Sequence, residues 1–450
     1  MGSPNTDQTF TSCLYSLPMN IKRLETSRLF HRFGFGPRPG EYAQALKDGI
    51  TPTRLRLTTI PINTSKVLPA IEPEITDLGK RPDANTPEVV PFAIAMRSQS
   101  IAMGLWWLDM MALSDHGLAE RMVWFWHGHW ATSIQKVNFP LPMFNQNKVL
   151  RTHALGNFSA MTKAMLNDGA LQFWLDGQDN TVKAPNENLG RELMELFVLG
   201  VNRYSEDDVK AISRALTGYQ VVRSNGTVTL NQKRQDLNPV TLLGKTAVFS
   251  GETLSDFLVA RDDCATFISE RLWYRFISST ETMPSNFSAK GGFAARDLSA
   301  TVQAMATDSA MQNPRYALVK SPVEWFISAC RALALTPSRL ETSNQLIGHL
   351  DKLGQVPFNP PNFGGWPAGE AWLSSATAQY RLAFASWLIK QSDLSAITQI
   401  PRESRVLKSA DWLGVPEWSA RTQSALRTAT DDPAQFVLLA LCSPEYIVSA

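Results

Sequence analysis

The fold class is decided by residues 101–130, which read IAMGLWWLDMMALSDHGLAERMVWFWHGHW. Apolar residues recur in this stretch with the spacing of helices that bury one face. The pattern is interrupted near Ser114–Gly117, where small and polar residues are typical of a loop. The stretch therefore predicts two consecutive helices. Because no strands alternate with such helices along the chain, a mainly α protein is favoured over an α/β protein.

Composition sets the class of protein around this stretch. The chain has 450 residues, of which 44% are hydrophobic and 19% charged, a balance typical of a globular protein with a sizeable core. The formal net charge of +2 gives no electrostatic footprint for nucleic acid or for an anionic membrane surface. We therefore expect a protein that binds neither.

The chain carries no pattern that would place it in or across a membrane. No apolar run reaches about 18 residues, so no transmembrane span is expected. The start of the chain lacks a basic region followed by an apolar one, so no signal peptide is indicated. As written, the chain is expected to be soluble and cytoplasmic, or else a trimmed form of an exported protein.

Applied to the whole chain, the same reasoning predicts a multi-helix single unit. We expect a flexible N-terminus over residues 1–20 and one helical domain over residues 21–450. A Ser-Asn-Gly turn between β-branched runs predicts a small β-hairpin insertion at about 219–250. A long Pro/Gly/Trp loop, GQVPFNPPNFGGWPAGEAWLSS, is expected over residues 354–375.

One predicted helix concentrates polar residues on a single face. The segment NENLGRELMELFVLG, residues 186–200, begins with an asparagine suited to an N-cap and ends with a glycine suited to a helix stop. At about 100° per residue, one face collects four polar side chains, opposite an apolar face. These four are Asn188, Arg191, Glu192 and Glu195.

This polar face has two interpretations. It can be a solvated face, in which Arg191 pairs with Glu187 and Glu195 one turn away on either side. It can also be a catalytic site, in which Arg191 keeps one of the two carboxylates ionised or binds an anionic substrate. Burial would then raise the pKa of the other carboxyl and suit Glu192 or Glu195 to acid–base chemistry.

The sequence FWHGHW raises a similar question about His127 and His129. On a helix their side chains diverge by about 200°, whereas on a strand they share a face. They converge only if the helix ends or distorts near Gly128, which glycine permits. One interpretation places one ring in the aromatic core and exposes the other. The second makes both rings proton carriers, or ligands of a divalent or transition metal together with Glu192.

The aromatic loop over residues 354–375 is too rich in Trp, Pro and Gly for a solvated linker. It is either a loop packed on the core by its aromatic side chains, or a rigid wall of a ligand cleft. The second interpretation makes four side chains candidates for substrate binding. They are Asn188, Trp366, Trp372 and Arg381.

Several stretches, in this order, resemble a bacterial family known as domain of unknown function 1800. They are RLFHRFGFGPRPGE, LAERMVWFWHGHWATS, PNENLGRELMELFVLGV, VKSPVEW, the aromatic loop and LCSPEY. The resemblance spans nearly the whole chain. One segment departs from the family pattern, because Gln235 and Val240 stand where His and Lys are expected.

The resemblance implies a predominantly helical and usually exported protein, often encoded beside a sulfatase-like partner. It also implies that eight residues belong to the family's motif set. They are His127, His129, Asn186, Glu187, Asn188, Arg191, Glu192 and Glu195. The resemblance supplies no reaction.

Together these features lead us to expect an enzyme with a cleft between the histidine segment and the Asn186 helix. Its catalytic groups would be His127, Arg191, Glu192 and Glu195. Hydrolysis of a glycan or another cell-surface polymer is the favoured reaction, because paired carboxylates and abundant Trp suit it. The alternatives are a metal-dependent oxidoreductase with His and Glu ligands, or a non-catalytic export or assembly protein.

Overall fold

A computed structural model describes residues 20–59, 69–287 and 291–449. Within them the protein is mainly α-helical, as predicted, and its few strands form small two-stranded sheets. The flexible N-terminus predicted over residues 1–20 lies outside the described residues, apart from Asn20. The side chain of Asn20 caps the first helix, α1, by accepting the Arg23 N–H at 3.2 Å.

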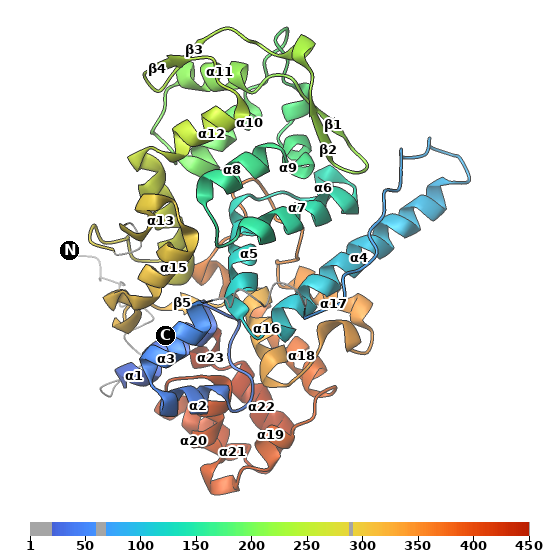
Figure 1. Ribbon diagram of the computed structural model, residues 1–450. Helices are drawn as coiled ribbons and strands as arrows, with labels where there is room; N and C mark the ends of the chain where they lie inside the picture. The colour runs from blue at the N-terminus through green and yellow to red at the C-terminus, as the bar shows by residue number, and fades with distance from the viewer. Residues whose placement is uncertain (1–19, 60–68, 288–290, 450) are drawn as a thin grey trace, which may run out of the picture.

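The two helices predicted from residues 101–130 are present. They are α4 (Val89–Leu113) and α5 (Gly117–His129), and the chain between them turns at Ser114. Figure 1 shows α5 at the centre of the molecule, whereas the N-terminal half of α4 extends away from its body. Both helices bury tryptophans fully, among them Trp107 and Trp126. The break at Ser114 thus separates a helix that leaves the core from one that forms its centre.

The other helices cover α5 from two sides (Figure 1). One group comprises α7 (Pro140–His153), α8 (Phe158–Leu166), α9 (Gly169–Trp174), α10 (Asn188–Glu192), α11 (Glu206–Ala215), α12 (Gly251–Val259), α13 (Asp262–Phe276) and α15 (Leu298–Thr307). The other comprises α1 (Ile21–Arg32), α2 (Glu41–Asp48), α3 (Ile50–Thr58), α16 (Pro322–Ala332), α17 (Ser343–Lys352), α18 (Ser375–Ile389), α20 (Arg402–Leu413), α21 (Ala420–Thr428) and α22 (Pro433–Leu441). Of the short helices, α6 (Ile134–Val137) packs with the first group, whereas α19 (Ser395–Thr398) and α23 (Pro444–Ile447) pack with the second.

The insertion at 219–250 contains two hairpins where the sequence predicted one. Strands β1 (Tyr219–Val222) and β2 (Thr227–Leu230) pair across the predicted Ser-Asn-Gly turn. Strands β3 (Val240–Leu242) and β4 (Lys245–Ala247) pair across Leu243–Gly244, both with positive φ. A two-residue turn of this kind normally carries Asn or Asp at its first position, so a leucine there hid the second hairpin.

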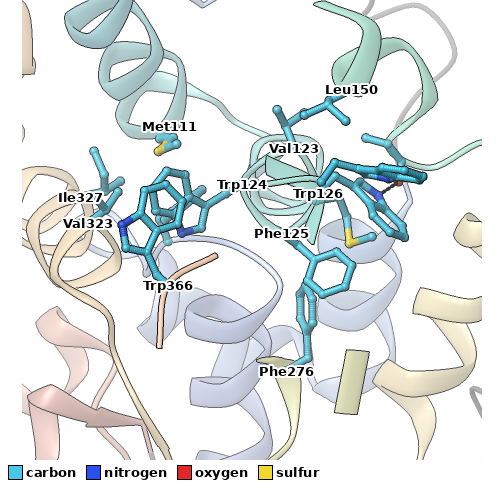
Figure 2. Packing of buried hydrophobic residues seen from close by; sticks show 14 of the residues in the cluster. Met111, Val123, Trp124, Phe125, Trp126, Leu150, Phe276, Val323, Ile327 and Trp366 are labelled. Atoms are coloured by element: carbon cyan, nitrogen blue, oxygen red, sulfur yellow. Dashed lines mark hydrogen bonds between the residues drawn. The ribbon is translucent and has the colours of Figure 1, made fainter. Parts of the chain in front are cut away.

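Apolar residues, many of them aromatic, pack around helix α5 (Figure 2). Trp124 stacks on Trp366 with ring centroids 5.0 Å apart, and Phe125 meets Phe276 at 5.6 Å. On another side of the helix, Trp126 donates its ring N–H to the Ala154 carbonyl at 2.9 Å. A helix that is buried all round is hydrophobic on all faces, which explains the high aromatic content of residues 101–130.

The aromatic loop over residues 354–375 belongs to this core. Its side chains Phe358, Trp366 and Trp372 are all less than 5% exposed. The loop reaches α5 through a contact of two glycines, since a Cβ atom on Gly365 would lie 2.2 Å from the Gly128 carbonyl oxygen. Packing of the loop on the core, one of its two predicted interpretations, is therefore what the structure shows.

The same contact predicts opposite effects for two substitutions. Gly365→Ala is expected to destabilise the fold by roughly 2 kcal/mol or more, because Gly365 has a φ of +78° and no room for a methyl group. Gly128→Ala is expected to be neutral or to stabilise by up to about 1 kcal/mol, since its Cβ would meet only Trp366 at 3.9 Å. Urea unfolding of both variants measures the difference. Equal destabilisation would contradict the close approach described here.

Candidate functional site

The Asn186 segment is the best-defined candidate site, and its backbone is unusual. Asn186 accepts the Asn188 N–H at 2.9 Å just before α10, whereas the N-cap position itself is held by Glu187 and not by Asn186 as predicted. After Glu192 the chain continues as a π-helical turn, η4 (Leu193–Val198), in which the Leu199 N–H reaches the Met194 carbonyl at 2.8 Å. π-turns are rare and occur frequently at functional sites. The sequence predicted a regular helix here.

The π-turn carries one of the two candidate carboxylates, and a tyrosine holds that carboxylate. Tyr204 donates its hydroxyl hydrogen bond to Oε2 of Glu195. Burial, followed by this hydrogen bond, raises the pKa of Tyr204. The tyrosine therefore stays protonated and fixes the carboxylate as an acceptor. Sequence reasoning missed Tyr204, whose only signal was a polar aromatic residue just before the capping box of α11.

The second carboxylate, Glu192, lies in a different environment. It is partly buried and has no hydrogen-bond or ion-pair partner in the described part of the chain. Burial raises the pKa of Glu192, the negative charge of Glu195 raises it further, and Arg191 opposes both effects. The two carboxyls thus differ: Glu195 is held by a donor, whereas Glu192 favours its protonated form more than an ordinary glutamate does.

Arg191 is engaged elsewhere. It pairs with Glu187 at 3.1 Å, as the solvated interpretation of this helix predicted, and with Glu206 at 2.7 Å. The predicted partner Glu195 is not part of this group, because Tyr204 holds it. Both carboxylates raise the pKa of Arg191, and the hydrogen bonds that Arg191 donates to Glu206 have the largest effect. Arg191 therefore acts on Glu192 only as a nearby charge.

Asn188 lies one helical turn before Glu192 and belongs to a small polar chain. Its side-chain amide donates to Asp176 at 3.2 Å, and Lys136 donates to the same carboxylate at 2.7 Å. Asp176 and Lys136 are both partly exposed. This chain extends the polar face of the Asn186 helix. Asn188 therefore lies on the polar face predicted for it, and substrate binding by Asn188 stays a prediction.

The two histidines lie on opposite sides of α5, because the helix continues through Gly128 to His129. His127 accepts the Phe358 N–H on its Nε2 atom at 3.1 Å. His129 donates from Nε2 to the Phe197 carbonyl at 2.9 Å. Both rings are almost fully buried, and burial lowers the pKa of each to about 3. They are neutral side chains bound to backbone groups, and neither ring is exposed.

His129 nevertheless contacts the π-turn of the candidate site from its buried side. Its partner Phe197 lies in the π-turn, near the C-terminal end of the helix, where carbonyl groups lack intrahelical partners. The histidine segment and the Asn186 helix are therefore in contact, and the cleft predicted between them stays a prediction. They meet through an imidazole and a backbone carbonyl.

The metal interpretation required His127, His129 and Glu192 to converge. Over residues 20–59, 69–287 and 291–449, no group of three or more His, Cys, Asp or Glu side chains could hold a metal ion. The two histidines do not converge because α5 continues through Gly128 to His129. Each ring is therefore hydrogen-bonded to a different backbone group.

The residues predicted to bind substrate from the C-terminal region are buried. Trp366 and Trp372 are 4% exposed and Arg381 is 1% exposed. Trp366 packs on α5, and Arg381 donates to the Trp372 carbonyl at 3.0 Å. They therefore offer no open aromatic surface to a sugar ring.

A second candidate feature is a small cavity near α5, at which four of the stretches that carry the family resemblance meet. Residues from these four stretches line the cavity. They are His31, Arg32, Arg121, Lys320, Ser321, Glu324 and Trp372. Segments far apart in the sequence thus share a buried polar environment, which spacing along the chain could not reveal.

Comparison with known proteins identifies one family. A family model described as protein of unknown function (DUF1800) matches residues 28–448. No curated protein and no solved structure matches the chain. The residues of both features described above fall within the matched range.

The buried histidines predict how stability depends on pH. Their pKa values are about 3 in the fold, against 6.5 for an unperturbed histidine. Below pH 6.5 the unfolded chain binds protons that the folded chain excludes, so this stability is complete above pH 6.5 and is lost as the pH falls toward 3. Each ring contributes a slope of about 1.4 kcal/mol per pH unit.

Urea unfolding between pH 5 and 7.5 checks this expectation. The double variant His127→Gln/His129→Gln should show a shallower pH dependence than the unmodified protein, while His116→Gln, outside the aromatic cluster, should not. A double variant that keeps the full slope would mean that other groups carry the pH dependence.

Proposed function

The chain belongs to the DUF1800 family of proteins of unknown function, and we propose that it is an acid–base hydrolase. Its reacting groups are Glu192 and the Glu195–Tyr204 pair at the π-turn. The observation that carries the proposal is the difference between the two carboxyls, one unpartnered with a raised pKa and one held by a tyrosine.

Glu192 is the general acid in this proposal. A general acid needs a proton at working pH, and burial beside a second carboxylate raises the pKa of Glu192 in the direction that this role requires. Because Arg191 is occupied by Glu187 and Glu206, no direct ion pair holds Glu192 in its ionised form. The Glu192 carboxyl is therefore free to approach a leaving group.

Glu195 is the base or nucleophile. The Tyr204 hydroxyl donates a hydrogen bond to the Glu195 carboxylate and orients it. Two carboxyls in opposite protonation states are the groups that glycosidic hydrolysis uses. A glycan or a similar cell-surface polymer is therefore the substrate class that we propose, with Asn188 as the neighbouring hydrogen-bonding group.

A second candidate function is non-catalytic binding, and the exposed part of α4 favours it. Two adjoining hollows of about 620 and 710 Å³ follow this helix and share Arg97, Ser100 and Ile134. Their other walls are mostly apolar, and Arg81 and Lys352 add positive charge. An apolar groove with a basic rim suits a small amphiphile with an anionic head group.

Partner and location are also proposals. The family resemblance implies an exported protein that works with a sulfatase-like partner. Two apolar side chains on α4, Val90 and Ile94, are 65% and 61% exposed and give such a partner an apolar contact surface. No helix among the described residues is long and apolar enough to span a membrane.

The hydrolase proposal predicts the effect of removing one proton donor. Glu192→Gln is expected to lower kcat by about 100-fold or more on the active member of a panel of polysaccharides and aryl glycosides. Release of reducing ends or of the aryl group measures the rate. For the unmodified protein, kcat/KM should fall as the pH rises through the raised pKa of Glu192.

Controls separate the chemistry from the fold. Glu187→Gln removes a carboxylate of the same helix that only pairs with Arg191, and should leave kcat within a few-fold of the unmodified value. Tyr204→Phe should lower kcat less than Glu192→Gln. If the unmodified protein cleaves nothing on the panel, or if Glu192→Gln remains fully active, glycan hydrolysis at this site is wrong.

The binding alternative predicts a defined ligand response. The fluorescent probe 1-anilinonaphthalene-8-sulfonate combines apolar rings with one anionic group and should bind the α4 groove. Met96→Glu places a charge in the groove wall and should weaken binding about tenfold or more. Leu55→Glu changes an exposed leucine on α3 and should leave it unchanged. Equal probe affinity in both variants would reject the groove as the binding site.

A further inference from the structure

Two small cavities share one largely buried ion pair in their walls. Each has a volume of about 30 Å³, and both are lined by Arg121, Arg275, Ser321 and Glu324. The Arg121 guanidinium donates to the Glu324 carboxylate. A cavity of this size has room for a water molecule or a small ion and excludes larger ligands.

The charge around these cavities is unbalanced. Glu324 is the one carboxylate among the lining residues, whereas four cationic side chains line the first cavity. Three of them are the guanidinium groups of Arg32, Arg121 and Arg275, and the fourth is Lys320, whose pKa burial lowers well below its usual value. The remaining titratable neighbours are His31, whose pKa burial lowers well below its usual value, and Tyr274.

The cations are bound mainly to neutral groups. Arg32 donates to the carbonyls of Ile277 and Ser449 at 2.9 Å each, and Arg275 donates to the Pro367 carbonyl at 3.0 Å. Lys320 donates to the Tyr446 carbonyl at 2.7 Å. Carbonyl groups satisfy hydrogen bonds but do not neutralise charge. Burying several cations with one anion is costly unless a further negative charge is present.

Two hydrogen-bond donors that line the first cavity have no partner in the described residues. They are the hydroxyl of Ser321 and the ring N–H of Trp372. Both side chains are buried, at 5% and 4% exposure. Ser321 also begins α16, whose N-terminal end is positive. An unpaired buried donor is uncommon in a stable fold, so two beside one cavity call for an acceptor there.

We propose that this cavity binds a small inorganic anion of halide size, with chloride as its ordinary occupant. Ser321 and Trp372 donate hydrogen bonds to it, and the surrounding guanidinium groups neutralise its charge. An anion accounts for the charge imbalance and for the unpaired donors together, whereas a water molecule would account only for the donors. The site joins α1, α5, α13, α16 and the aromatic loop, so the anion stabilises the core and is independent of the Glu192 chemistry.

Thermal unfolding of the full chain in chloride and in gluconate, at equal ionic strength, tests the proposal. Chloride should raise Tm on the order of 2 °C in a saturable way, because it binds the folded state alone, while gluconate is too large to enter. Crystals soaked in bromide should show an anomalous peak between Ser321 and Trp372. Equal Tm values in the two salts together with no bromide peak would overturn the site.

Variants link any chloride effect to the cavity. Ser321→Ala/Trp372→Phe removes both donors without changing charge and should abolish the chloride-dependent shift. Trp130→Phe is the matched control, because the Trp130 ring N–H is also buried and unpartnered but does not line either cavity. It should lower Tm in both salts and keep the shift. A double variant that keeps the shift would overturn the assignment; if the double variant does not fold, Ser321→Ala alone and the bromide peak decide.

Discussion

The constraint on which the structure depends is that α5 is buried on every side. A helix without a solvent face has to find an internal partner for each polar side chain that it carries. Glu120 accepts from Trp107 at 3.2 Å and from Arg151 at 3.0 Å, and Arg121 is bound to Glu324. Every element that supplies such a partner is thereby fixed relative to the helix.

The aromatic loop shows how this constraint organises distant parts of the chain. Its Phe358 N–H binds His127, and the carbonyls of Trp366 and Pro367 bind Arg275 on α13. The close approach of Gly365 to Gly128 is what brings the loop near enough for these contacts. A segment that looks like a surface loop in the sequence is therefore a structural part of the core. Its tryptophans pack in the protein interior and are not available to bind a ligand at the surface.

Local rules account for what the sequence predicted correctly. The break at Ser114 and the turn before β2 both follow from residues within a few positions of one another. The π-turn, the burial of Trp366 and the partners of the two histidines depend on segments far apart in the chain. No spacing rule reports which carbonyl an imidazole meets, so helical geometry could show only that the two rings diverge.

The histidine pair and the carboxylates are connected, although not as ligands of one site. His129 donates to the Phe197 carbonyl, which belongs to the π-turn that also carries Glu195. Lowering of the imidazole pKa by burial keeps the ring neutral and leaves Nε2 as a fixed donor over the physiological pH range. The buried helix thus supports the π-turn from its apolar side, while Glu192 and Tyr204 lie on its partly exposed side. In the proposed hydrolase, His129 is a positioning residue and the carboxylates carry the acid–base chemistry.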